Sequence, residues 1–315
     1  DRLREGEQCE CKMKIKSYKY ECMLVGCAML WGLQFSMLKF VGETFDATTL
    51  LLIKFFLSAL ILVLMDFKNI RFQNTRMVVH SILLGVLVAT HTYFQTVGLA
   101  NTNPANSSFI ITTNVIYVPI IMFFLFGKKP SKNMVIGLVS ITAGFLFISG
   151  IVTLNPLSFQ LKLGYGDLLS LICAILTAVY MVYFNFLSSK YDEKSVNIIH
   201  LAAAAVTMLI VWAFVGIFGE YKMDFTNVPA VIGLMYCGIF SGGIASLLLA
   251  KGTAKVEASK TAILCGLEPV FATIFAAILT VFIPALDGKL TVAIVLGGAL
   301  ILYGAIKSSL LPENK

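Results

Sequence analysis

The chain has 315 residues, of which 58% are hydrophobic and 13% are charged, and its formal net charge is +7. Soluble domains carry roughly 25% charged residues, so this composition excludes an ordinary soluble fold. The positive charge would suit a nucleic acid, but it lies in short segments between long apolar runs, where it would contact lipid headgroups. We therefore expect a lipid bilayer as partner and no nucleic acid.

Long apolar runs follow one another along the whole chain. A bilayer core about 30 Å thick needs about 20 apolar residues in a helix. The runs are rich in Gly, Ala and Ser and show few period-2 segments, which favours helices over a β-barrel. The predicted spans are residues 21–40, 47–65, 77–97, 104–126, 133–151, 165–187, 197–218, 228–250, 260–283 and 289–309.

The first span follows a basic segment, residues 1–19, whose origin is open. Met13 begins a stretch typical of a bacterial start, so residues 1–12 could be an extension. A signal peptide is the alternative interpretation of residues 13–35. The apolar run is too long for one, and no small-x-small cleavage site follows it, so we expect it to remain as a span.

The two halves of the chain repeat one another. The segment GLANTNPANSSFIITTN, from Gly98 to Asn114, aligns without a gap with GTAKVEASKTAILCGLE, from Gly252 to Glu268. Both segments are small and polar and open an apolar helix. Two later glycines recur in the same way: Gly137 as Gly297 and Gly144 as Gly304.

A repeat of five spans reverses its orientation in the membrane, because five is odd. We therefore predict an all-α membrane protein with ten transmembrane helices, built as two inverted five-helix repeats over residues 20–151 and 165–311. Inverted repeats of this kind are typical of transporters with a central site. A passive channel or facilitator is one alternative. A membrane scaffold or sensor without transport is another alternative. A soluble regulatory domain would favour it, and the sequence does not indicate one.

Lys and Arg gather in alternate loops, which predicts the orientation in the membrane. The opposite loops hold only Lys162, Lys222 and Lys289. We therefore expect both termini in the cytoplasm and the protein in the inner membrane, as a monomer or homodimer. The basic residues of the alternate loops and termini are Arg2, Arg4, Lys12, Lys14, Lys16, Lys19, Lys68, Arg71, Arg76, Lys128, Lys129, Lys132, Lys190, Lys194, Lys251, Lys255, Lys260, Lys307 and Lys315.

Cysteine and histidine usage gives no sign of an enzyme, a metal site or a cofactor. The 7 cysteines lie mostly in predicted spans, so no disulfide framework is expected. His80 and His91 share the third span but would lie about 16 Å apart, too far to ligate one metal ion. Because no metalloprotease, hydrolase or phosphate-loop motif occurs, we predict a protein that is not an enzyme and needs no cofactor or metal.

Two ionisable side chains, Lys54 and Glu268, lie deep within predicted spans. Such a group costs roughly 3 kcal/mol or more in the membrane, so it usually faces a cavity or a partner. Pro269 follows Glu268 and would bend the helix, as in the broken helices of transporters. Glu268 is open to two interpretations: it carries a proton through the transport cycle, or it accepts hydrogen bonds that hold the halves together. Lys54 could instead extend toward the outer surface.

Other polar and aromatic residues would complete a binding site near mid-membrane. Asn114 is the first-half counterpart of Glu268, and His91 and Gln95 share one face of the third span. Tyr180 and Tyr183 offer aromatic walls with polar tips. The predicted substrate-binding residues are Lys54, Asn114, Tyr117, His91, Gln95, Tyr180, Tyr183, Gln34 and Trp31, with Glu268 in a coupling or structural role.

From about residue 20 to 309, the chain resembles the EamA-type drug/metabolite transporter family. The resemblance rests on the duplicated five-helix unit, the Trp31-Gly32 pair, the KVEASKTAILCGLEPVFATIFA stretch and the recurring glycines. It implies two EamA domains and alternating access for small metabolites, often amino acids leaving the cell. The chain departs from the family pattern in having Lys54 where Arg commonly precedes Phe. Val115 also stands where the first copy often has Pro.

The charges of the predicted site suggest a substrate class. Lys54 would attract a carboxylate, and Glu268 would attract an amine or a proton, which suits a zwitterion such as an amino acid. The alternative within transporters is an exchanger of sugar phosphates or nucleotide sugars. Its doubly charged phosphates would require more than one buried basic residue. Efflux and proton coupling are the expected direction and driving force.

Overall fold

Helices make up almost all of the chain that the structure describes. The computed structural model describes residues 2–66, 68, 70–102, 107, 110–148, 152–154, 157–159, 164–279 and 291–309. The helices are α1 (Arg2–Gly42), α2 (Ala47–Asp66), α3 (Thr75–Ala100), α5 (Asn114–Phe126), α6 (Lys132–Ile148), α7 (Tyr165–Lys190), α8 (Glu193–Phe218), α9 (Val228–Tyr236), the π-helix η2 (Cys237–Ile244), α10 (Ala245–Thr253), α11 (Ala258–Cys265), α12 (Glu268–Leu279) and α13 (Val292–Ser309).

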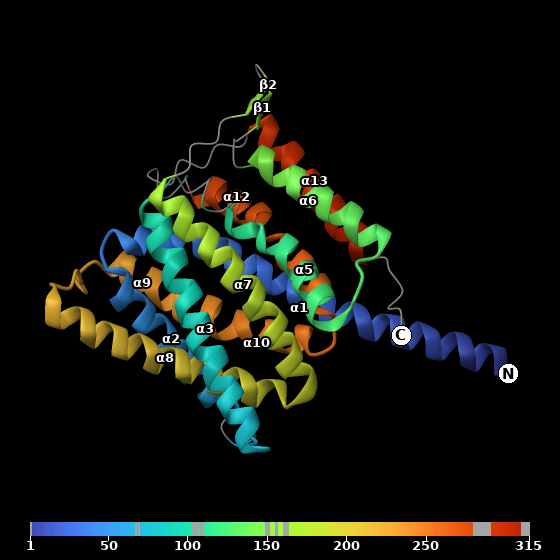
Figure 1. The fold of residues 1–315 in the computed structure, drawn as a ribbon, viewed down its shortest axis with the longest axis horizontal. Coiled ribbons are helices and arrows are strands. Elements are labelled where there is room, and N and C mark those ends of the chain that lie inside the picture. The colour runs from blue at the N-terminus through green and yellow to red at the C-terminus, as the bar shows by residue number, and fades with distance from the viewer. Residues whose placement is uncertain are drawn as a thin grey trace.

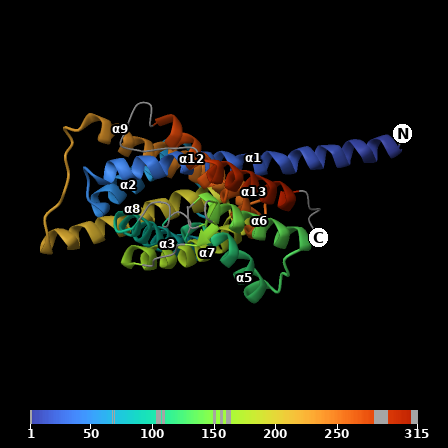
Figure 2. The same ribbon diagram turned by 90° about the horizontal axis from the view of Figure 1, so that it is seen from above.

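These helices confirm a helical membrane protein for the described chain. By length and composition, 7 helical segments can cross a membrane. Three shorter apolar helices accompany them: Ile110–Phe126, Lys132–Ile148 and Val292–Ser308. Helix α1 joins the basic N-terminal segment to the first predicted span, and its first turns project beyond the bundle (Figure 2). Residues 280–290, which include the end of the ninth predicted span and the start of the tenth, lie outside the described residues.

One element was not expected from the sequence. A short antiparallel hairpin pairs β1 (Val152–Leu154) with β2 (Leu157–Phe159), and Thr153 lies opposite Ser158. β-Branched and aromatic residues with alternating polarity favour strands. The three-residue strands are too short for that alternation to stand out beside the apolar runs of the spans.

Helices α6 and α13 pack against each other as antiparallel partners (Figure 1). A Cβ atom added at Gly137 would lie 2.7 Å from the Gly304 carbonyl oxygen, and one added at Gly144 would lie 2.4 Å from the Gly297 carbonyl oxygen. These four glycines are the ones that recur between the halves. Each contact is therefore matched by its counterpart, as a local two-fold axis between equivalent helices requires.

We expect Gly144→Ala to destabilise the protein, because the added methyl group would press on the Gly297 carbonyl and the Ile301 side chain. Overpacking of this kind typically costs about 1–3 kcal/mol. Thermal unfolding in detergent measures the effect. Gly42→Ala is the matched control, because an added Cβ there meets nothing within 4 Å. Equal melting temperatures for the two variants would contradict the tight contact.

Other helices of the two halves also make matched contacts. Helix α3 packs on α7 and α8, and its second-half counterpart, the α9–η2–α10 segment, packs on α1 and α2. Gly98 meets the start of α7 at Gly166 and Ser170, and Gly252 meets α1 at Tyr20 and Leu24. The two halves thus interlock, and each contributes helices to the walls between them.

The loops rich in Lys and Arg lie at one end of the bundle, which we call the basic end. Lys194 pairs with Asp66 at 2.5 Å, and Lys128 pairs with Glu257 at 3.2 Å. The Arg71 backbone N–H donates to the Ser195 hydroxyl at 2.8 Å. These contacts join the loop after α2 to the start of α8, and the loop after α5 to the turn before α11, all of which the charge pattern assigns to one side of the membrane.

The opposite end is closed by polar contacts of its own. The Asp46 backbone N–H donates to the Lys222 carbonyl at 2.7 Å, and the Asn227 amide donates to the Thr44 hydroxyl at 3.2 Å. Asp46 also caps α2, because its carboxylate accepts from the backbone N–H groups of Thr48 and Thr49 at 3.0 Å. This cap fixes the start of the helix that carries Lys54.

Asp46→Ala should destabilise the protein by about 1–2 kcal/mol at neutral pH through loss of the cap. Partial burial alone would raise the pKa of Asp46, but the hydrogen bonds from Thr48 and Thr49 outweigh it and lower the pKa below its ordinary value. A lowered folded-state pKa gives stability that is present above the unfolded pKa and lost as the pH falls. Thermal unfolding should therefore separate variant from wild type at pH 7, and the difference should begin to shrink near pH 4 and vanish only below the lowered folded-state pKa.

The control is Asp224→Ala. Asp224 makes similar bonds to Thr226, but in an exposed turn. An Asp46→Ala effect that persists undiminished in acid would contradict the capping role of the carboxylate.

Candidate functional site

A cavity of about 100 Å³ lies between the two halves, with room for several water molecules. Both halves line it, through helices α1, α2, α3, α5, α7, α8, η2, α10, α11 and α12 or the turns that join them. We call it the central cavity. Eight residues that the sequence singled out line it: Trp31, Gln34, Lys54, His91, Gln95, Asn114, Tyr180 and Glu268.

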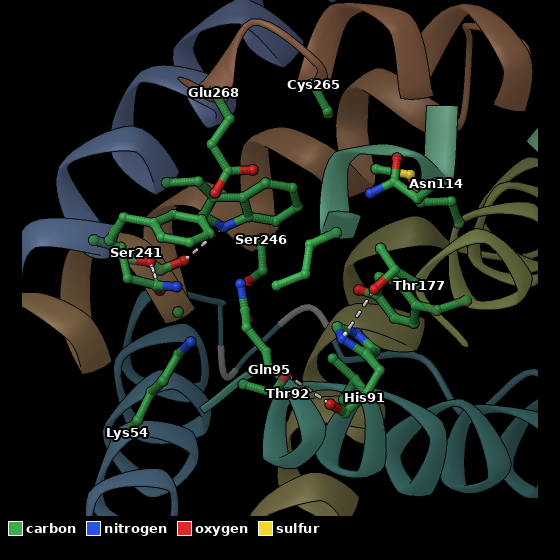
Figure 3. Close-up of a pocket in the computed structure, with 18 of the residues that line it drawn as sticks. Lys54, His91, Thr92, Gln95, Asn114, Thr177, Ser241, Ser246, Cys265 and Glu268 are labelled. Atoms are coloured by element: carbon green, nitrogen blue, oxygen red, sulfur yellow. Dashed lines mark hydrogen bonds between the residues drawn. The ribbon is translucent and has the colours of Figure 1, made fainter. Parts of the chain in front are cut away.

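The two ionisable residues predicted to share a cavity do so. Lys54 of α2 and Glu268 of α12 point into the cavity from opposite walls, with Gln95 and Ser246 between them (Figure 3). The Lys54 side chain is buried, at 6% exposure. Within the described chain, no ion pair joins Lys54 to Glu268. The cavity therefore has an amine on one side and a carboxyl group on the other that are not in direct contact.

Glu268 lies at a break between two short helices. Helix α11 ends at Cys265, Gly266 follows as its C-cap, and α12 begins at Glu268. Pro269 is accommodated because the first backbone N–H groups of a helix have no partner within it. The first half shows the same arrangement, since α5 begins at Asn114, the residue aligned with Glu268. Both interrupted regions thus present a helix N-terminus at the cavity wall.

Close packing of α1 positions Glu268. A Cβ added at Gly32 would lie 2.9 Å from the Glu268 carbonyl oxygen, so only glycine lets α12 approach α1 this closely. The neighbouring Trp31 indole N–H donates to the Ser241 carbonyl at 3.2 Å, and the Ser241 hydroxyl donates to the Gln34 side-chain oxygen. The Trp31-Gly32 pair therefore links α1 to α12 on one side and to the π-helix η2 on the other.

Contacts with η2 also position Lys54. The Ser58 hydroxyl lies 2.6 Å from the Lys54 carbonyl and 2.9 Å from the Gly238 carbonyl. A Cβ at Gly242 would clash with the Ser58 side chain, so glycines allow α2 to pack on η2. Gly238 and Gly242 thus let α2 and η2 pack closely, as small residues do between membrane helices. The Lys54 backbone is thereby held against η2.

A histidine and a tyrosine form a further wall of the cavity. The rings of His91 and Tyr180 lie 5.1 Å apart between centroids, and His91 Nδ1 lies 3.4 Å from the Thr177 hydroxyl. His91 Nε2 is buried and has no hydrogen-bond partner within the described chain. Buried polar atoms are nearly always satisfied, so this nitrogen is a candidate contact for a bound solute or water.

Two predicted lining residues lie elsewhere. The Tyr183 hydroxyl contacts His80 Nδ1 at 2.5 Å, and Tyr117 packs against the hydrophobic core. Tyr183 lies three residues after Tyr180, so it points about 60° away around the helix. Neither tyrosine lines the central cavity.

Several lining residues were missed because they are small and carry no distinctive sequence signal. Ser and Thr in membrane helices usually serve packing, so their type alone does not identify a site. Thr92 was detectable, because it follows His91 on the predicted face of α3. The missed polar and sulfur-containing residues are Thr92, Thr112, Thr177, Ser241, Ser246 and Cys265.

The sequence as a whole matches known proteins. The EamA-like transporter family matches residues 18–150 and again residues 164–306. An uncharacterized transporter from Archaeoglobus fulgidus is 26% identical over 248 residues, which cover 79% of this chain and 74% of the relative. The uncharacterized transporter YyaM from Bacillus subtilis is 22% identical over 296 residues, which cover 91% of this chain and 92% of the relative.

The fold also matches a solved structure. A protein crystal structure with 18% sequence identity superposes with a TM-score of 0.72, covering 92% of this chain and 96% of the other. At this identity the likeness establishes the fold alone.

Proposed function

Because the chain belongs to the EamA-like transporter family, a family of membrane transporters, we propose that it moves small zwitterionic metabolites of the amino-acid class by alternating access. The observation that carries this proposal is the pair of ionisable side chains, the Lys54 amine and the Glu268 carboxyl group, on facing walls of the central cavity. A carboxylate would bind at Lys54 and an ammonium group at Glu268. Each would gain a charge-assisted hydrogen bond.

The residues between the charges support a small polar solute. Gln95 and Ser246 lie between Lys54 and Glu268, and His91 Nε2 has no hydrogen-bond partner among the described residues. Lys54 is the only Lys or Arg among the described residues that line the central cavity. One buried cation suits a single carboxylate better than a doubly charged phosphate, so the amino-acid class is favoured over sugar phosphates.

We propose that ten helices span the cytoplasmic membrane as two inverted units, residues 20–151 and 165–311, with both termini in the cytoplasm. The antiparallel packing of α6 on α13 supports the inversion, and the clustering of Lys and Arg at the basic end supports the orientation. The solute moves outward, driven by the proton gradient. Glu268 binds a proton when the solute's amine is absent.

Uptake into proteoliposomes tests this function. Vesicles containing the purified protein are offered a panel of radiolabelled L-amino acids, with and without a pH gradient. We expect saturable uptake of at least one zwitterion, accumulated against its gradient when the pH differs across the membrane. Uptake that only equilibrates would indicate a passive facilitator. Uptake of sugar phosphates but of no amino acid would refute the proposed substrate class.

A further inference from the structure

A second cavity, of about 180 Å³, opens at the basic end of the bundle. Its walls come from the end of α2, the start of α8 and α10. Its polar lining residues are Asp66, Lys194, Asn197 and Lys251. We call it the inner cavity. It is distinct from the central cavity, because the two share no lining residue.

The inner cavity carries a net positive charge. Lys194 and Asp66 form an ion pair at 2.5 Å, which leaves the charge of Lys251 uncompensated among the lining residues. No ion pair of Lys251 occurs within the described chain. A half-buried ammonium group in a concave, low-dielectric wall concentrates anions near it.

Asn197 is the polar group that the fold leaves unsatisfied at this cavity. Its side chain is fully buried, and its Oδ1 has no hydrogen-bond partner within the described residues. Its Nδ2 donates to the Ser246 hydroxyl at 3.3 Å, and that hydroxyl donates to the Gly243 carbonyl at 2.8 Å. Among the described residues, the amide therefore has one unsatisfied acceptor beside a cavity lined by two lysines and one aspartate.

The bond between Asn197 and Ser246 separates the two cavities. Asn197 lines the inner cavity and Ser246 lines the central cavity. Leu201, one turn further along α8, also lines the central cavity, so the two lie about 6 Å apart along this helix. On α10, Leu247 and Lys251 continue from Ser246 toward the basic end. The cavities therefore follow one another along the same helices, and the Asn197–Ser246 hydrogen bond lies between them.

We propose that the inner cavity is an anion-receiving vestibule of the transport path, in which Lys251 binds the carboxylate of the solute and the Asn197–Ser246 hydrogen bond closes the way to the central cavity. Asn197 Oδ1 accepts from the solute's ammonium group as it passes. This inference rests on the proposed transport function. It adds a second binding position in which a lysine again binds the carboxylate and a side-chain oxygen binds the ammonium group.

Thiol labelling tests the vestibule without requiring any knowledge of the solute. The reporter is Gln95→Cys, in the central cavity, followed by mass spectrometry of its peptide. Purified protein in detergent is treated with anionic sulfonatoethyl or cationic trimethylammonioethyl methanethiosulfonate. We expect the anionic reagent to react faster than the cationic one, when the rate of each is divided by its rate with a free thiol. Lys251→Gln should reduce the anion-to-cation ratio on the order of fivefold.

Two further variants test the closing bond. Asn197→Ala should raise the labelling rates of both reagents severalfold while keeping their ratio, because it removes the bond but not the charge. Ser246→Ala removes the same bond from the other partner, so the test survives if one variant fails to fold. Lys129→Gln, an exposed lysine at the same end outside the cavity, is the matched control and should change neither rate nor ratio.

The proposal is overturned if Lys251→Gln leaves the ratio equal to that of the Lys129→Gln control. It is also overturned if folded Asn197→Ala or Ser246→Ala protein labels no faster than the reporter alone. These outcomes do not depend on transport, so they can be told apart from failure of the proteoliposome assay. If amino-acid uptake is observed but labelling shows no preference for the anionic reagent, the proposed function stands and only the vestibule proposal is rejected.

Discussion

Glu268→Gln is expected to weaken binding of a zwitterionic substrate about 10- to 100-fold, which corresponds to about 1.4–2.8 kcal/mol. Glutamine keeps the shape and remains an acceptor at the start of α12, so helix packing against Gly32 is preserved. The substitution removes only the negative charge that would bind the ammonium group. Equilibrium binding of a transported amino acid, and of its analogue without the amino group, measures the effect.

The analogue makes the prediction specific. If Glu268 binds the amine, the variant should lose affinity for the amino acid and keep its affinity for the carboxylic acid that lacks the amine. Glu257→Gln is the control, because Glu257 pairs with Lys128 in an exposed position before α11. Equal losses for both ligands would indicate instead that Glu268 supports the fold of the site. Loss of the pH-gradient effect on uptake would assign it the proton as well.

Lys54→Gln is expected to weaken binding of the solute's carboxylate, whereas Glu268→Gln weakens binding of its amine. Loss of the buried ammonium group should weaken binding of the amino acid by a similar factor of about 10–100, because a charge-assisted bond to the carboxylate is lost. The decarboxylated amine should bind as well as it does to wild-type protein. Equilibrium binding of the two ligands measures the difference, and Lys132→Gln at the exposed start of α6 serves as control.

The two variants together test the orientation of the solute. A double variant should lose little more affinity for either single-charge analogue than the one relevant substitution does. If Lys54→Gln weakens the amine and the amino acid alike, Lys54 is not the carboxylate partner. The solute would then have to lie across the cavity in another direction.

The central features of the site were predictable because the two halves of the chain repeat. Alignment of the halves paired Asn114 with Glu268, and the structure places each as the first residue of a helix. The cost of a charge within the membrane identified Lys54 and Glu268 as cavity residues, which both are. Expectations that rested on the energetics of the membrane were therefore met by the geometry.

Expectations about individual side chains and local helix form were less reliable. Tyr183 was selected with Tyr180 as an aromatic wall with a polar tip, but it lies on a neighbouring face of α7 and contacts His80 instead. The π-helix η2 left no mark on the apolar pattern of span 228–250. Its glycines are small enough for several backbone paths, and the choice among them depends on packing with Leu57 and Ser58 of α2. Those tertiary contacts cannot be read from the segment itself.

That π-helix also has a thermodynamic consequence. A carrier whose halves were identical would have outward-facing and inward-facing conformers of equal free energy, since exchanging the roles of the halves converts one into the other. Helix α3 runs as α-helix from Thr75 to Ala100, whereas its counterpart is widened between Cys237 and Ile244. This difference makes the two conformers unequal in free energy. Under the proposed alternating-access function, the empty carrier would therefore rest preferentially on one side of its cycle before any solute or gradient acts on it.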